Sequence, residues 1–149
     1  MMNKKIKNAT PTEYKGIKFK SILEKRSFEI LDTEGFNPGY EKFSVTLQES
    51  FRGTVPYYDR YYNRKLRKNV WGESIYKVQD IKYTPDIDFI YNGYHIVIEL
   101  KGFENDVSPM KMKLFRKYIE DHKEEKIRFF EVYALKDLKK AIEIIKSLT

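Results

Sequence analysis

The chain of 149 residues contains no cysteine, which excludes both a disulfide framework and a thiolate metal site. Its two histidines, His95 and His122, have no partner at metal-ligand spacing, and we interpret both as structural or surface groups. No apolar run approaches the roughly 20 residues of a membrane span. The basic residues 1–7 lack the apolar stretch of a signal peptide. We therefore expect an intracellular, cytoplasmic protein.

Positive charge is in excess. The sequence has 29 lysines and arginines against 22 acidic residues, a formal net charge of +7. A basic balance favours polyanionic partners but says nothing about the fold, and simple solubility is the alternative explanation. The length suits one domain over residues 1–149. Within it we expect a loosely ordered segment at residues 1–15 and an insertion at residues 53–80.

Hydrophobic periodicity predicts an α/β fold. Helices are expected at residues 20–33, 108–123 and 136–148, and strands at residues 43–51, 82–90, 94–100 and 127–133. Asn92-Gly93 predicts a tight turn that joins the second and third strands. Ser108 is expected to cap the middle helix, with Pro109 at its first position. The order of elements predicts one mixed central sheet flanked by helices.

Two carboxylates and an amine are expected at one end of the predicted hairpin. Asp86 follows Pro85, which interrupts a regular strand. Glu99 follows an apolar run, and the two-residue period of a strand places Glu99 and Lys101 on the same face. Such a set suits a hard cation beside a proton carrier, as in metal-dependent phosphodiester hydrolases. A Glu99–Lys101 ion pair on a half-exposed edge strand is the alternative.

Three nearby residues are open to two interpretations each. Gly102 either lets a phosphate approach Lys101 closely or simply ends the strand. Asp88 shares a face with Asp86, and we interpret it as a rim or structural acid rather than a ligand. Taken alone, Glu24 is an ordinary solvated glutamate of the first helix.

The insertion at residues 53–80 mixes aromatic and basic side chains. They are Tyr57, Tyr58, Tyr61, Tyr62, Trp71 and Tyr76 among Arg60, Arg64, Lys65, Arg67 and Lys68. A helix from about Tyr58 to Lys68 is expected. Cations neutralise phosphates and rings stack on unpaired bases, so the composition favours nucleic-acid binding. The alternative is that the tyrosines pack a small satellite core.

Three motifs occur in a suggestive order: Phe19-Lys20-Ser21-Ile22-Leu23-Glu24, then Tyr83-Thr84-Pro85-Asp86, then Glu99-Leu100-Lys101-Gly102. Together they resemble the motifs of the PD-(D/E)xK nuclease superfamily. The closer likeness is to phage-type Holliday-junction resolving endonucleases and related small phage endonucleases, over roughly residues 16–133. This resemblance implies a restriction-endonuclease-like core of order α-β-β-β-α-β, with the insertion between the first two strands. A phage-encoded protein would act in the cytoplasm of the host cell.

The resemblance also implies a Mg²⁺ or Mn²⁺ site. Asp86 and Glu99 would hold the metal together with the carbonyl of Leu100, and Glu24 would reach a second metal directly or through water. Lys101 would orient or deprotonate the attacking water and help to stabilise the transition state. We assign further DNA contacts to Lys20, Ser21 and Lys113.

The expected activity is therefore divalent-metal-dependent hydrolysis of DNA, with branched DNA as the favoured substrate. A sequence-dependent or nicking nuclease of the same fold and a non-catalytic nucleic-acid-binding protein are the alternatives. In the resolving enzymes the region that corresponds to residues 53–80 is a bridge through which protomers exchange elements. A homodimer formed through this bridge and a DNA clamp both remain open.

Overall fold

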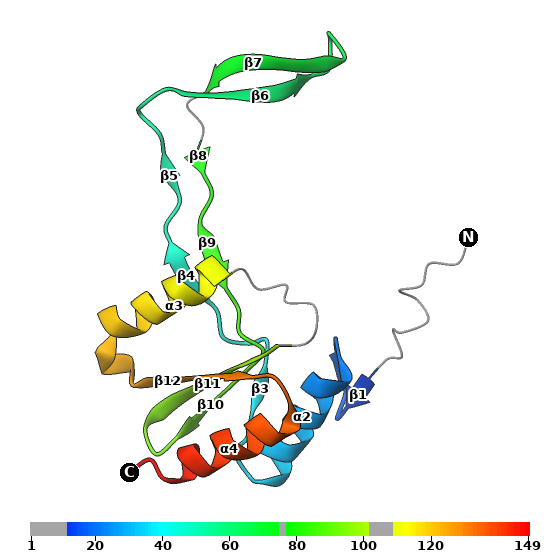
Figure 1. The fold of residues 1–149 in the computed structure, drawn as a ribbon, viewed down its shortest axis with the longest axis vertical. Helices are drawn as coiled ribbons and strands as arrows, with labels where there is room; N and C mark the ends of the chain where they lie inside the picture. The colour runs from blue at the N-terminus through cyan, green and yellow to red at the C-terminus, as the bar shows by residue number, and fades with distance from the viewer. Residues whose placement is uncertain (1–11, 75–76, 102–108) are drawn as a thin grey trace, which may run out of the picture. The chain divides into compact units, whose positions relative to one another are not determined.

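The computed structural model describes residues 12–74, 77–101 and 109–149 (Figure 1). Two compact units are present. The core unit comprises the described parts of residues 1–45 and 83–149, and the hairpin unit comprises those of residues 46–82. Each unit is treated by itself.

A four-stranded mixed sheet forms the centre of the core unit, in the order β12-β11-β10-β3. Its strands are β3 (Gly39–Tyr40), β10 (Ile87–Tyr91), β11 (Tyr94–Leu100) and β12 (Ile127–Val132). β10 runs antiparallel to β11 and to β3, whereas β12 runs parallel to β11. The predicted mixed α/β class is confirmed.

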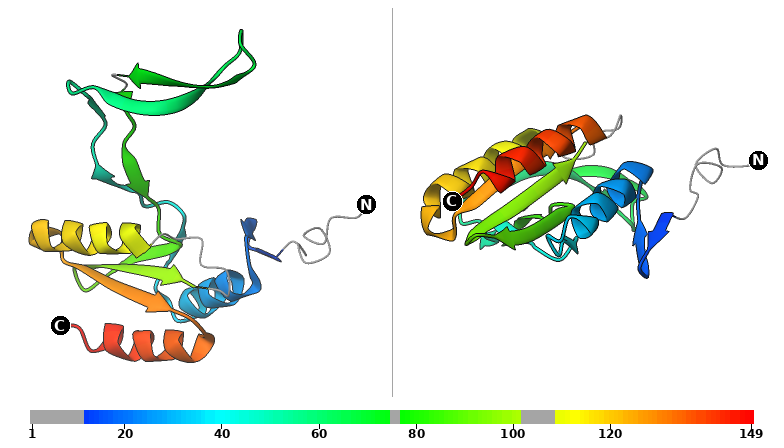
Figure 2. Two further views of the ribbon diagram at one scale, coloured as in Figure 1. Left: turned by 45° about the horizontal axis from the view of Figure 1, so that its top comes forward. Right: turned by 90° about the horizontal axis from the view of Figure 1, so that it is seen from below.

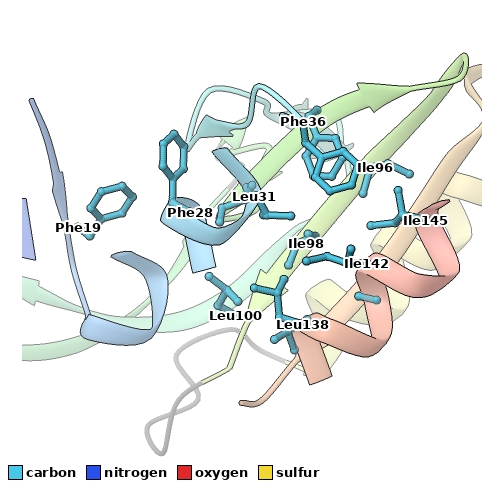
Figure 3. Close-up of a cluster of buried hydrophobic side chains, with 14 residues drawn as sticks. Phe19, Phe28, Leu31, Phe36, Ile96, Ile98, Leu100, Leu138, Ile142 and Ile145 are labelled. Carbon is cyan, nitrogen blue, oxygen red and sulfur yellow. The ribbon is translucent and has the colours of Figure 1, made fainter. Parts of the chain in front are cut away.

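Helices cover both faces of this sheet (Figure 2). They are α2 (Ile22–Thr33), α3 (Pro109–Asp121) and α4 (Leu135–Lys146), with a short 3₁₀ turn η1 (Lys123–Glu125). α2 and α4 share one apolar cluster with the sheet, in which Leu31, Leu138 and Ile145 are fully buried (Figure 3). On the other face, Phe115 of α3 contacts the rings of Tyr83 and Phe129 at 4.9 and 5.0 Å. The prediction of a sheet flanked by helices is confirmed.

Alternation along β11 decides which side chains reach each face. Ile96, Ile98 and Leu100 belong to the cluster shared with α2 and α4. Val97 and Glu99 therefore face the side that α3 covers. The turn Asn92-Gly93 has φ values of 48° and 80°, and Tyr91 pairs with Tyr94 across it. The predicted hairpin is thus confirmed, because both turn residues adopt the positive φ that this tight turn requires.

The hairpin unit consists of three nested pairs of strands. β4 (Val45–Gln48) pairs with β9 (Ile81–Tyr83), β5 (Phe51–Arg52) with β8 (Lys77–Val78), and β6 (Tyr57–Asn63) with β7 (Lys68–Ser74). The helix predicted from Tyr58 to Lys68 is wrong, because these residues form the β6–β7 hairpin. Asn63 Oδ1 accepts hydrogen bonds from the amides of Lys65 and Leu66, both at 3.0 Å, and so builds the turn.

Other boundaries also differ from the predictions. Thr12–Tyr14 form β1, which pairs with β2 (Ile17–Phe19), so this part of the N-terminal segment is not loose. The strand predicted at 43–51 becomes β4 and β5, and β3 occupies the edge of the sheet. The strand predicted at 82–90 is divided into β9 and β10 by Thr84-Pro85-Asp86, because proline donates no ladder hydrogen bond.

Pro109 begins α3 as predicted. Ser108, Gly102 and Tyr76 lie outside the described residues. Within the described ranges, none of the helices has the length and apolar character needed to cross a membrane.

Candidate active site

The β10–β11 hairpin places Asp86 against the end of β11. The amide of Leu100 donates a hydrogen bond to Asp86 Oδ2 at 2.7 Å. In an extended residue the N–H and the C=O point toward the same neighbouring strand, so the carbonyl of Leu100 also faces the side of Asp86. On the other side, the amide of Glu41 donates to the main-chain oxygen of Asp86 at 2.9 Å. The Pro-Asp and Glu-x-Lys motifs therefore meet directly.

Glu99 lies in the interior beside this contact and is only 3% exposed. The hydroxyl of Tyr83 donates to Glu99 Oε2 at 2.5 Å. Phe115 packs against the ring of Tyr83 and holds it in this orientation. Sequence reasoning included Tyr83 in a motif but missed its hydrogen bond, since the contact depends on how β9 approaches β11.

Lys101 follows β11 and is largely enclosed, with its side chain 9% exposed. Its Nζ lies 3.1 Å from Glu131 Oε1, and its amide donates to the carbonyl of Val132 at 2.8 Å. Glu131 sits directly opposite Glu99 in the parallel register of β11 and β12. The side chains of Glu99 and Lys101 thus face the same side, as predicted.

The alternative of a Glu99–Lys101 ion pair on an edge strand is not supported. β11 is an inner strand, with β10 on one side and β12 on the other. Among the described residues, the ion pair of Lys101 is with Glu131. Glu131 was missed because the pairing of β12 with β11 joins distant parts of the chain.

Glu24 lies in the first turn of α2, where it completes the cap of the helix. Ser21 Oγ accepts from the amide of Glu24 at 3.1 Å, and Glu24 Oε2 accepts from the amide of Lys20 at 3.0 Å. This reciprocal arrangement is close to a capping box. The hydroxyl of Tyr40 also donates to Glu24 Oε2, at 2.7 Å. The structure therefore gives both Ser21 and Glu24 work in the helix cap.

Two further predicted residues have defined partners. Lys20 Nζ lies 2.8 Å from Glu41 Oε1. Asp88 Oδ2 lies 2.8 Å from His95 Nε2, which agrees with a structural interpretation of both residues. His122 contacts the carbonyl of Tyr118 through Nδ1 at 2.8 Å.

Burial raises the pKa of both central carboxyls. The pKa of Asp86 rises to about 8, chiefly because the group is removed from water and then because Glu99 repels its charge. The pKa of Glu99 rises to about 7, again chiefly through burial, although the Tyr83 hydrogen bond and the charge of Lys101 oppose the rise. Burial and the Glu99 carboxylate also raise the pKa of Tyr83. The carboxyl pair is therefore costly to ionise without a cation.

The predicted set of three carboxylate ligands is not assembled as such. Among the described residues, no group of three or more histidine, cysteine or acidic side chains is placed to hold a metal ion. Glu24 Oε2 is occupied by Lys20 and Tyr40. Asp86, Glu99 and the carbonyl of Leu100 nevertheless offer the oxygen donors that Mg²⁺ and Mn²⁺ prefer, with water completing the shell. A divalent cation would also offset the burial and repulsion that raise both pKa values.

Two hollows lie on the core unit. One, of about 680 Å³, is lined by Lys101 together with residues from the starts of α2 and α4, namely Ile22, Leu23, Arg26, Tyr133, Ala134 and Leu135. The other, of about 470 Å³, is lined by Lys113, Arg116, Lys117, Ile119, Glu120 and Phe129. Lys113 was expected to face the site, but it lines this second hollow, away from Lys101. Arg26 was missed by sequence reasoning.

The predicted basic residues of the insertion are all exposed along the β6–β7 hairpin. They are Arg60, Arg64, Lys65, Arg67 and Lys68. Tyr57, Tyr58, Tyr61 and Tyr62 are between 48% and 64% exposed. The alternative of a buried satellite core built by these tyrosines is therefore wrong.

Comparison with protein-family models, with curated proteins and with solved structures found no match to this chain. Arguments about function therefore rest on the residues of the site.

Proposed function

We propose that this protein is a divalent-metal-dependent endonuclease that hydrolyses phosphodiester bonds of DNA, with the PD-(D/E)xK arrangement and a restriction-endonuclease-like core. The observation that carries the proposal is the 2.7 Å hydrogen bond from the Leu100 amide to Asp86. It joins the Pro-Asp motif to the Glu-x-Lys motif at one end of two adjacent strands. Basic charge over the whole chain, +7, suits a polyanionic substrate.

The charge around Asp86 supports a cation site. Asp86 is raised in pKa by Glu99, Glu24 and Glu41, and Glu131 acts on the adjacent Tyr83. The two lysines of this region, Lys20 and Lys101, are already paired with Glu41 and Glu131. Negative charge therefore predominates locally in a basic protein, which favours a divalent cation there.

In this proposal Asp86, Glu99 and the Leu100 carbonyl hold Mg²⁺ or Mn²⁺. When bound, the metal supplies a Lewis acid that polarises the phosphate and lowers the pKa of coordinated water. Lys101, held by Glu131, positions the attacking water and offsets negative charge that develops on the phosphoryl oxygens. Tyr83 fixes the orientation of Glu99 through their hydrogen bond.

The hollow beside Lys101 is suited to the approaching strand. Arg26 and Lys101 supply positive charge on its lining, while Ile22, Leu23 and Leu135 supply apolar surface. A phosphate can pair with the cations while a sugar or base contacts the apolar part. We propose that the scissile strand enters the site from this side.

Cleavage assays test the proposal. Purified protein is incubated in Mg²⁺ or Mn²⁺ with a four-way junction, a matched duplex and a single strand. Wild type should cleave, and Asp86→Asn and Glu99→Gln should abolish cleavage while DNA binding remains near normal. Asp88→Asn is the matched control, because Asp88 lies on the same strand but is engaged with His95. Activity retained in Glu99→Gln would remove the assignment.

The same assay addresses the finer expectation of branched DNA. We propose that the enzyme acts in the cytoplasm on junctions, which requires paired nicks and hence two active sites. A dimer mass in light scattering together with paired junction nicks supports this reading. Site-specific cuts in the duplex would instead favour a sequence-dependent nuclease.

A further inference from the structure

The pairing of β6 with β7 sorts the side chains of this hairpin onto two faces. Arg60 is opposite Trp71, Tyr62 is opposite Asn69, and Tyr58 is opposite Glu73. Residues directly opposite each other share a face, and the side chains of a strand alternate between faces. One face, which we call the Trp71 face, therefore carries Tyr58, Arg60, Tyr62 and Trp71.

The other face has a different character. It carries Tyr57, Asp59 and Tyr61 from β6, opposite Ser74, Gly72 and Val70 of β7. The ring of Tyr61 lies over Gly72, where an added Cβ would come within 2.5 Å of Tyr61 Cε1. Glycine thus makes room for a ring that packs within the hairpin, and an acidic side chain lies on the same face.

The rings of the Trp71 face are open to solvent. Trp71 is 72% exposed, Tyr58 is 64% exposed and Tyr62 is 60% exposed. Tyr58 and Tyr62 are about 13 Å apart along the strand, from a rise of about 3.3 Å per residue. Each ring is therefore separately accessible. Aromatic surface left uncovered in this way is typical of a binding surface.

Charge identifies the kind of partner. Residues 57–74 contain five lysines and arginines but two acids, Asp59 and Glu73. Arg60 stands on the Trp71 face itself, and the turn carries four further exposed cations that we call the basic tip: Arg64, Lys65, Arg67 and Lys68. Such a surface complements an anionic partner that also offers flat rings. A second copy of the hairpin would bring the same positive charge against itself.

We propose that the Trp71 face stacks on unpaired bases of a DNA strand while the basic tip binds the phosphates of that strand. Aromatic rings with interleaved cations bind single strands in this way, because every base offers a π-face. The inference rests on the proposed function, since it names the part of a DNA substrate that this hairpin recognises. Unpaired bases are the part that distinguishes branched or distorted DNA from a regular duplex.

Trp71 is the single tryptophan of the chain, so its intrinsic fluorescence reports on this face alone. The experiment titrates the protein with a short single-stranded oligonucleotide and with its duplex, in EDTA so that no cleavage occurs. Single strand should quench the emission and bind more tightly than duplex. Trp71→Ala, read by anisotropy of a labelled strand, should weaken binding by about 5- to 100-fold, and Trp71→Phe should restore much of it.

Tyr57→Ala is the matched control, as a tyrosine of the same strand on the opposite face. It should leave binding of the single strand unchanged within about twofold. Equal affinity of Trp71→Ala and wild type, or equal quenching by single strand and duplex, would overturn the proposal. A Trp71 emission that changes with protein concentration without DNA, with a matching rise in mass, would assign the face to a second copy instead. Because the titration is free of metal, its failure leaves the cleavage assay of Asp86 and Glu99 untouched.

Discussion

The raised pKa of Asp86 leads to a prediction about the stability of the metal-free protein. Burial is the main cause of the rise, and repulsion from Glu99 is the second. Asp86→Asn removes the charge, whereas the amide oxygen of asparagine can still accept the hydrogen bond from Leu100. We therefore expect Asp86→Asn to be more stable than wild type at alkaline pH, although it should not cleave DNA.

The size of this gain follows from the linkage between protonation and folding. The pKa of Asp86 rises from 3.8 to about 8, and each pKa unit corresponds to about 1.4 kcal/mol, which bounds the cost of the ionised carboxylate at about 5 kcal/mol. Glu99 takes up a proton over an overlapping range, so the two carboxyls share this cost. We expect Asp86→Asn to raise the free energy of unfolding by about 2–3 kcal/mol above about pH 8.

The sign of the pH dependence is fixed by the same linkage. Between the unfolded pKa of 3.8 and the folded pKa of about 8, the folded state binds more protons than the unfolded state. The contribution of Asp86 therefore lowers wild-type stability as pH rises through this window, and the effect levels off above it. The advantage of Asp86→Asn should grow over the same window.

Urea unfolding in EDTA at several pH values measures these stabilities. Asp88→Asn serves as the control, because it loses an ion pair with His95 and should not gain stability. A wild-type minus Asp86→Asn difference that stays constant with pH, or that favours wild type at alkaline pH, would refute the reasoning.

Three further predictions concern other parts of the protein. Glu24→Ala should lower the free energy of unfolding by about 1 kcal/mol through loss of the cap, whereas Glu24→Gln should keep it; if Glu24→Gln also lowers cleavage in Mg²⁺, Glu24 contributes to metal binding as well. Tyr83→Phe should raise the pKa of Glu99 further, because it removes a hydrogen bond to the ionised form. Its cleavage rate should then fall near neutral pH and recover at higher pH, and an unchanged pH profile would contradict this role. Reversal of three charges of the basic tip should weaken binding of single-stranded DNA and flatten its salt dependence by about 0.7 in slope per lost phosphate contact; the three are Arg64, Arg67 and Lys68.

Local patterns predicted the elements that position the site. The β10–β11 hairpin follows from Asn92-Gly93 between two apolar segments, and both signals act over a few residues. α4 follows from its apolar stripe, which meets the sheet at Leu138 and Ile145 as expected. The placement of Asp86 beside the end of β11 then follows from the hairpin alone.

Contacts between distant segments could not be predicted in the same way. The pairing of Glu131 opposite Glu99 depends on β12 adding in parallel to β11, and no short-range signal sets this register. The β6–β7 hairpin was expected to be a helix because its polar and aromatic residues show no clear period. The cap at Ser21 and Glu24, by contrast, was readable from the sequence, since a serine three residues before a glutamate is a helix-start signal.

The account depends most on whether Asp86 and Glu99 hold a divalent cation together. Calorimetric titration of the metal-free protein with Mn²⁺, without DNA, tests this directly. Wild type and Asp88→Asn should bind the metal with similar heats, and Asp86→Asn and Glu99→Gln should each lose most of that heat. Equal Mn²⁺ binding by all four proteins, or none by wild type near pH 8, would contradict the metal site and with it the proposed nuclease.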